Sequence, residues 1–197
     1  MEEKHMDFHP LTQDRWEDFE TLFGVHGAVG GCWCMWWRLK RSEFNAQKGE
    51  VNRESMRSIV SSGDVPGILA YMDGKVVGWC SVTARESFPV LDRSRVLKPI
   101  DEQPVWSVVC FFIDKTYRHQ GVSHQLLRAA VRYAKDQGAQ IVEGYPVDPK
   151  RGSTADLFAF TGTHSAFLKA GFVEVARRSE TRPIMRYYFN TPNIELT

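Results

Sequence analysis

The stretch that decides the fold is WSVVCFFIDKTYRHQGVSHQLLRAAVRYAKDQ, residues 106–137. Its first part, Trp106–Ile113, is an almost continuous apolar run rich in β-branched and aromatic side chains, which is typical of a buried central strand. After a short basic loop, apolar residues recur at helical spacing from Gly121 to Gln137, and Gly138 can end that helix. The stretch therefore predicts a buried strand, a loop and an amphipathic helix in succession.

The turn between this strand and this helix has the features of an anion-binding site. The first amide groups of a helix have no partners within the helix, and the helix dipole favours a negative charge there. Gly121 lets the backbone approach a ligand without a Cβ atom in the way, while Arg118 adds positive charge and His119 adds hydrogen-bonding capacity. These residues predict a phosphate or diphosphate cradle, although the spacing matches neither a Walker loop nor a dinucleotide fingerprint.

The sequence on both sides of this unit predicts further strands and helices. Asp73-Gly74 separates two strand-like runs, Gly67–Met72 and Val76–Thr83, and indicates a hairpin because both turn residues tolerate positive φ. The other expected elements are helices near 12–23 and 51–61, a loop over 85–104, a strand at 141–145, a helix at 165–170, and strands at 172–177 and 184–189. This order predicts an α/β fold with a mixed sheet, in which residues 106–145 form a parallel strand–helix–strand crossover.

Length and composition limit the classes of protein to which the chain can belong. With 197 residues, 43% of them hydrophobic, we expect one domain over residues 1–197 with its core at about 8–189. A net charge of +1 gives no strong field for nucleic acid, and the apolar runs are too short to span a membrane. The N-terminus lacks the apolar stretch of a signal peptide, so we expect a cytoplasmic protein with reduced cysteines. A single Cys32-x-Cys34 pair supplies too few ligands for a closed zinc site, so we expect no metal.

The turn sequence also resembles that of a known family. Arg118–Ser123, RHQGVS, is similar to the Arg/Gln-x-x-Gly-x-Gly/Ala signature of the GCN5-related N-acetyltransferases (GNAT), with Ser123 where Gly or Ala is usual. Further along, Ala166–Phe172, AFLKAGF, resembles the late helix of that family and its closing Gly-Phe. The resemblance covers roughly residues 8–189, because the hairpin before the signature and the strand pair after it also agree.

The resemblance implies a fold, a co-substrate and a reaction. It implies a single domain with a mixed, mostly antiparallel sheet, flanked by helices, in which a central pair of parallel strands splays apart. Acetyl-CoA would lie at the splay, and the amine of a small-molecule or peptide acceptor would attack its thioester directly. The residues that would contact the coenzyme are Phe111, Phe112 and Ile113 on the strand and Arg118, His119, Gln120, Gly121, Val122, Ser123 and His124 at the helix start.

The catalytic groups depart from the usual pattern of the family. A Tyr four residues before the closing Gly often acts as the acid, and that position here is Phe167, which cannot donate a proton. Glu143 matches a position where some members hold a catalytic Glu, and Tyr145 lies on the same face of the same expected strand. The resemblance implies that Glu143 and Tyr145 form a base–acid pair. The alternative is that Glu143 pairs with an arginine or meets solvent and Tyr145 packs.

A tryptophan-rich segment, GGCWCMWWR at residues 30–38, lies where relatives build the acceptor pocket. Trp33, Trp36 and Trp37 would form either aromatic walls around a substrate, for example a cation, or a buried hydrophobic plug. The sequence thus favours an acetyl-CoA-dependent N-acetyltransferase. The alternative function, which Phe167 keeps open, is a catalytically silent acyl-CoA-binding sensor or partner module. The sequence does not name the acceptor, and a homodimer stays open.

Overall fold

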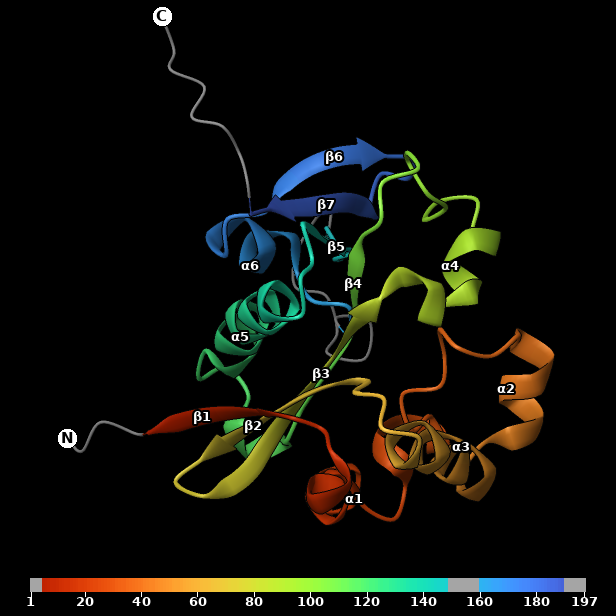
Figure 1. The fold of residues 1–197 in the computed structure, drawn as a ribbon, viewed down its shortest axis with the longest axis vertical. Helices are drawn as coiled ribbons and strands as arrows, with labels where there is room; N and C mark the ends of the chain where they lie inside the picture. Colours follow the sequence, from red (N-terminus) through yellow and green to blue (C-terminus); the bar gives the residue numbers. More distant parts are fainter. Residues whose placement is uncertain (1–4, 149–159, 190–197) are drawn as a thin grey trace, which may run out of the picture.

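A seven-stranded sheet forms the centre of the molecule (Figure 1). The computed structural model describes residues 5–148 and 160–189. The strands are β1 (Met6–Pro10), β2 (Gly67–Met72), β3 (Lys75–Ala84), β4 (Trp106–Ile113), β5 (Ile141–Gly144), β6 (Val173–Arg177) and β7 (Pro183–Tyr188). They are arranged in the order β1-β2-β3-β4-β5-β7-β6, and every neighbouring pair is antiparallel except β4 and β5. The predicted α/β fold with a mixed, mostly antiparallel sheet is confirmed.

Helices cover both faces of this sheet (Figure 1). They are α1 (Trp16–Phe23), α2 (Arg41–Gln47), α3 (Glu50–Ser61), α4 (Pro89–Arg93), α5 (Val122–Asp136) and α6 (His164–Lys169). One hydrophobic cluster joins α5 and α6 to one face, and a second joins α1 and α3 to the other. Within residues 5–148 and 160–189, no helix is long and apolar enough to cross a membrane.

The helix α5 is held by the apolar stripe that the sequence predicts. Val122, Leu126, Leu127, Ala130, Val131 and Ala134 are all buried. They belong to the cluster that contains apolar side chains of β2, β3 and β4. Because the stripe begins at the first residue of the helix, the packing fixes the start of α5 close to the end of β4.

The parallel strands β4 and β5 stay paired over only a short distance. The pairing joins 106–108 to 142–144, whereas on its other side β4 remains paired with β3 as far as Ile113. The two parallel strands therefore separate beyond Val108, which is the predicted splay. In addition, Ser81 pairs with Cys110 but Val82 pairs with Val108, so Val109 forms a bulge without a partner on β3.

Three elements differ from the expectation. The edge strand β1 precedes the first helix, α2 lies in a stretch without predicted structure, and α4 lies in the expected loop at 85–104. Both α2 and α4 are short, and each buries a single apolar residue, Phe44 or Leu91. A single buried position gives no periodic signal, which explains why the sequence pattern does not reveal these helices.

Candidate active site

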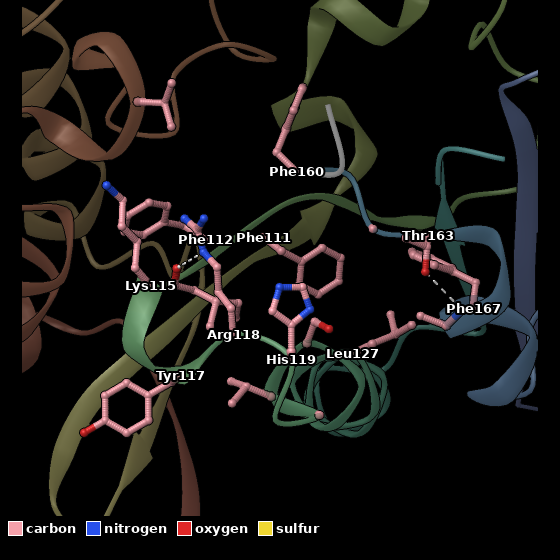
Figure 2. A pocket seen from close by; sticks show the side chains of 17 residues that line it. Phe111, Phe112, Lys115, Tyr117, Arg118, His119, Leu127, Phe160, Thr163 and Phe167 are labelled. Carbon is pink, nitrogen blue, oxygen red and sulfur yellow. Dashed lines mark hydrogen bonds between the residues drawn. The ribbon is translucent and has the colours of Figure 1, made fainter. Parts of the chain in front are cut away.

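A pocket of about 510 Å³ lies between the end of β4, the start of α5 and the start of α6 (Figure 2). Most of the predicted coenzyme-binding residues line it, namely Phe111, Phe112, Ile113, Arg118, His119, Gly121, Val122 and Ser123. Two predicted residues do not. The side-chain amide of Gln120 donates to the carbonyl of Thr116, 2.8 Å away, and the backbone amide of His124 donates to the carbonyl of Gly121 at 3.1 Å.

Other lining residues were not among the predicted coenzyme-binding residues, although the resemblance had already placed Phe167 at the position of the family's usual acid. They are Val29, Lys115, Tyr117, Leu127, Phe160, Gly162, Thr163, Ala166 and Phe167. Lys115 and Tyr117 belong to the same basic loop as the signature, so the sequence could have predicted that they line the pocket. Val29 comes from the segment after α1, and Phe160 from the segment before α6; only the tertiary fold brings these segments together.

The start of α5 presents open backbone to this pocket. Gly121 caps the helix with φ of 81°, and a Cβ atom built there would meet no heavy atom within 4 Å. The amides of His124 and Gln125 donate to the carbonyl of Gly121, at 3.1 and 3.2 Å. The amides of Val122 and Ser123, which precede them, have no acceptor within the helix. Open space in front of free amide groups suits an anion.

Two positively charged side chains and a histidine surround this helix start. Lys115, Arg118 and His119 all line the pocket (Figure 2). The Nε atom of Arg118 donates to the carbonyl of Ile113 at 3.2 Å, which ties the guanidinium to the end of β4. His119 has a φ of 59°, a conformation that few residues other than glycine adopt, and such conformations cluster at functional sites. The charge and the free amides together complement a phosphate or diphosphate group.

A segment before α6 occupies part of the splay. The backbone amide of Phe111 donates to the carbonyl of Phe160 at 2.6 Å. On the other side, Val147, just after β5, donates to the carbonyl of Gly162 and accepts from the amide of His164, both at 2.9 Å. The segment therefore lies between β4 and the continuation of β5. A ligand that paired with the Phe111 amide would have to replace the Phe160 carbonyl.

Phe167 reaches the pocket from α6 and is fully buried. Its ring meets those of Phe111 and Phe172 edge to face, with centroids 6.4 and 4.8 Å away. A Cβ atom on Gly144 would lie 2.1 Å from this ring, and one on Gly162 would lie 2.7 Å from it. The two glycines thus make room for a ring that carries no proton donor.

Glu143 and Tyr145 contact each other, as their spacing on the strand predicts. The Tyr145 hydroxyl donates to Oε1 of Glu143 at 2.7 Å. The two residues are only 1% and 0% exposed, and neither lines the pocket. Arg85 donates to Oε1 of Glu143 at 2.9 Å, and Arg186 donates to Oε2 at 2.7 Å. Both carboxylate oxygens are therefore already bound to arginines, which favours the structural alternative.

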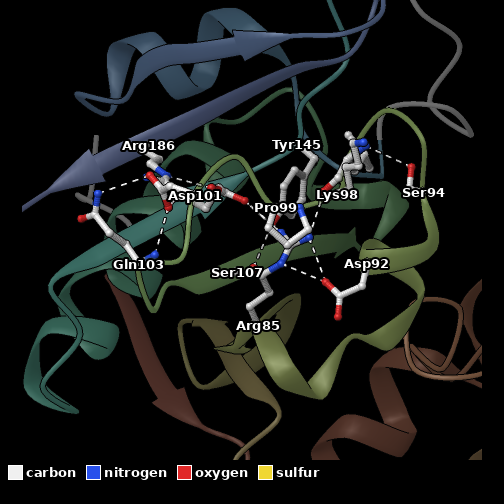
Figure 3. Close-up of polar contacts among 12 residues, drawn as sticks. Arg85, Asp92, Ser94, Lys98, Pro99, Asp101, Gln103, Ser107, Tyr145 and Arg186 are labelled. Atoms are coloured by element: carbon white, nitrogen blue, oxygen red, sulfur yellow. Dashed lines mark hydrogen bonds and ion pairs between the residues drawn. The ribbon is translucent and has the colours of Figure 1, made fainter.

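The contacts of Glu143 with Arg85 and Arg186 belong to a larger polar network (Figure 3). Arg186 also donates to both oxygens of Asp101, at 2.6 and 2.9 Å, and these hydrogen bonds hold the pKa of Asp101 below its usual value. Ser107 lies 2.9 Å from the Tyr145 hydroxyl. Burial, together with the charge of Glu143, raises the pKa of Tyr145 well above 10, so the hydroxyl stays protonated. The network joins the ends of β3, β4, β5 and β7.

The three tryptophans of the 30–38 segment have different surroundings. Trp33 is 5% exposed and stacks on Phe23 with a centroid distance of 5.6 Å, so it lies in the core beneath α1. Trp36 and Trp37 are half-buried and line a second hollow, between α2 and α4. Only these two are placed where a ligand can reach them.

Fold and pocket together define a class of protein: an α/β domain in which a helix start that suits an anion lies at the splay of two parallel strands. The family model described as acetyltransferase (GNAT) family matches residues 33–153, which is more than half of the chain. The chain belongs to the GNAT acetyltransferase family.

Solved structures share the fold over almost the whole chain. One is the aminoglycoside N-acetyltransferase AAC(6')-Iy in complex with CoA, which is 18% identical, with 90% of this chain and 93% of that chain covered and a TM-score of 0.54. The PaiA N-acetyltransferase from Thermoplasma acidophilum in complex with coenzyme A is 14% identical, with 94% and 99% covered and a TM-score of 0.52. A GNAT-family acetyltransferase from Listeria monocytogenes is 10% identical, with 94% and 99% covered and a TM-score of 0.58. Curated protein sequences give no match.

Proposed function

We propose that this protein transfers the acetyl group of acetyl-CoA to an amine by direct attack. The observation that carries the proposal is the start of α5, where open space lies before Gly121 and cations surround the free amides of Val122 and Ser123. Family membership supports this function. So do the coenzyme A complexes of two acetyltransferases with the same fold, AAC(6')-Iy and PaiA.

The residues that line the pocket fit the parts of acetyl-CoA. The amides at the helix start, with Arg118 and Lys115, would hold the diphosphate. The pantetheine arm contains amide groups, which can hydrogen-bond to the backbone of β4 once the Phe160 carbonyl has left the Phe111 amide. The apolar side chains of Leu127 and Phe167 would border the arm. We therefore propose that the acetyl group lies near the bulge of β4.

The chemistry needs few groups from the protein. The amine nitrogen forms a bond to the thioester carbon, and the carbon–sulfur bond breaks. The nitrogen gives up a proton to solvent water, and coenzyme A leaves as a thiolate that takes up a proton. A thiol pKa of about 8.5 makes the thiolate a tolerable leaving group, so a donor at position 167 is not required. Binding both reactants side by side supplies proximity and orientation, which account for a large part of the rate.

We propose a positioning role for Glu143 and Tyr145. A general base needs an oxygen within reach of the amine, directly or through one water. Each oxygen of Glu143 instead accepts from an arginine, and its side chain is buried. These contacts support a pair that holds the end of β5 in place rather than one that moves a proton.

A second candidate function is an acyl-CoA-binding module without turnover, which the absence of a donor at Phe167 favours. An acceptor screen separates the two. The protein would be mixed with acetyl-CoA and polyamines, aminoglycosides, amino acids or peptides, and free thiol would be measured. We expect thiol release that depends on one class of amine. Coenzyme binding without release across the panel would favour the silent module, and absence of coenzyme binding would contradict both.

A further inference from the structure

The second hollow is a groove between α2 and α4, distinct from the pocket at the start of α5. It has a volume of about 290 Å³. Its lining is Trp36, Trp37, Leu39, Arg41, Phe44, Val90, Arg93 and Ser94. Apart from the two arginines and the serine, these side chains are apolar, and Trp36, Trp37, Leu39 and Val90 are only half-buried. The groove therefore combines an accessible apolar surface with two cations.

The aromatic walls of the groove are fixed by contacts with each other and with the central strand. Trp36 meets Phe44 edge to face, with centroids 5.0 Å apart. The indole N–H of Trp37 donates to the carbonyl of Val109 at 3.0 Å. Val109 is the bulge residue of β4, so its carbonyl is available for this contact. Trp37 thus presents its ring to the groove while its polar atom is bound to the central strand.

The two arginines have no acidic partner in the part of the chain that the structure describes. Arg41 lies over the ring of Trp36, with 4.1 Å from its guanidinium carbon to the centroid, and has no ion pair within residues 5–148 and 160–189. The nearby Glu43 faces Lys40 instead. Arg93, the last residue of α4, likewise has no ion pair among the described residues, and its neighbour Asp92 pairs with Arg85. Both guanidinium groups can therefore donate to an anion.

A positively charged occupant does not suit this groove. A cation would bind to the face of an aromatic ring, but Arg41 already covers the ring of Trp36, which leaves only that of Trp37 among the two tryptophans. Two arginines at the same groove would also repel it. A carboxylate, in contrast, would gain charge-assisted hydrogen bonds from the planar guanidinium groups.

We propose that this groove binds a small apolar carboxylate, with its hydrocarbon part on Trp36 and Trp37 and its carboxylate on Arg41 and Arg93. The walls recognise an aromatic or branched-aliphatic group by burying it, and the arginines select the charge. The proposal concerns binding alone and does not depend on acetyl transfer. Trp37 is hydrogen-bonded to the bulge of β4, which is the strand that borders the proposed coenzyme pocket. Only the side chain of Trp37 would therefore separate an occupant of the groove from that strand.

Three probes with the same ring and different charge test the proposal. Phenylacetate, phenylacetamide and phenethylamine would be titrated into the protein without acetyl-CoA, with tryptophan fluorescence and calorimetry as readouts. We expect phenylacetate to bind about tenfold more tightly than the amide, since one ionic hydrogen bond is lost, and the amine to bind most weakly. Arg41→Gln and Arg93→Gln should each weaken phenylacetate binding about tenfold, while Arg41→Lys, which keeps the charge, should weaken it less.

The control is Arg132→Gln, which removes a positive charge from the exposed face of α5 and should leave binding unchanged. Equal affinity for the carboxylate and the amide would overturn the proposal. So would tighter binding of the amine, no detectable binding of phenylacetate, or unchanged binding in both glutamine variants. None of these outcomes bears on the transfer of acetyl groups, because acetyl-CoA is absent from the measurement.

Discussion

Individual residues decide which chemistry this pocket supports. Phe167 places an aromatic edge where the family often has a hydroxyl, and the small residues Gly144 and Gly162 accommodate it. Glu143, which would be the base by resemblance, has both oxygens bound to arginines. A residue type at the expected position is therefore not enough to assign a catalytic role, because the partners determine whether its oxygen is available.

A substitution of Glu143 distinguishes a positioning role from the role of a general base. Glu143→Gln keeps the size of the side chain but removes the buried carboxylate that Arg85 and Arg186 share. Each arginine then keeps only its more exposed partner, Asp92 or Asp101. We expect the free energy of unfolding in urea to fall by about 3 kcal/mol, as on breaking a buried ion pair. The kcat per folded molecule, with an acceptor found by the screen, should stay unchanged, whereas loss of a general base would lower it by ~10²–10⁴-fold.

The matched control for this substitution is Glu174→Gln. Glu174 pairs with Arg177 near the surface of β6, so we expect its loss to cost less than about 1 kcal/mol. If Glu143→Gln is as stable as the wild type but loses most of its kcat, Glu143 is a catalytic base and the positioning role is wrong.

At the scale of elements, the structure depends on how the segment between β3 and β4 is held over the sheet. Arg85 at the end of β3 pairs with Asp92 on α4 and with Glu143 on β5. Asp101, in the connection to β4, pairs with Arg186 on β7. This segment also carries one wall of the groove, since Val90, Arg93 and Ser94 line it. Ion pairs at both ends thus fix this segment, together with the buried side chains of Phe88, Leu91 and Leu97.

The contribution of Asp101 should depend on pH. Hydrogen bonds from Arg186 lower its pKa in the folded protein, so the carboxylate stabilises the fold above its unfolded pKa of about 3.9. That contribution is lost as the pH falls through the lower folded-state pKa. Asp101→Asn should therefore be less stable than the wild type at pH 7, by at most about 1 kcal/mol because solvent screens this pair, and the gap should close below pH 4.

Urea unfolding of both proteins at pH 7 and at pH 3 measures this gap. Asp136→Asn serves as the control, because Asp136 is exposed and the described residues include no ion pair to it. A gap that stays constant down to pH 3 would mean that the ionised carboxylate is not what stabilises the segment.

At the scale of the whole molecule, the sequence predicts those features that depend on local pattern. The apolar run of β4, the stripe of α5 and the Asp73-Gly74 turn each lie within one short stretch, and all three are observed. The part of the proposed coenzyme pocket that β4 and α5 form follows from the same stretch, because the end of β4 and the start of α5 are adjacent in the chain.

Features that need distant partners could not be predicted in this way. Glu143 meets Arg85 and Arg186 across 58 and 43 residues, and no periodicity marks these pairs. The contact of Phe160 with Phe111 likewise depends on how the chain returns to the splay. Trp33 and Trp36 are close in sequence but separate into core and groove, because Trp33 and Cys34 adopt positive φ and turn the chain.

The central claim is that the start of α5 holds the diphosphate of acetyl-CoA, and calorimetry on two glycine variants tests it most directly. Gly121 and Gly138 lie at opposite ends of α5, both have positive φ, and a Cβ atom on either would meet open space. A glutamate at each position therefore adds similar backbone strain, of about 1–2 kcal/mol, and the same charge.

Only Gly121→Glu places that charge in front of the free amides that line the pocket. We predict that the wild type and Gly138→Glu bind acetyl-CoA equally and that Gly121→Glu, folded as judged by circular dichroism, shows no binding. Equal binding by Gly121→Glu and the wild type would contradict the account.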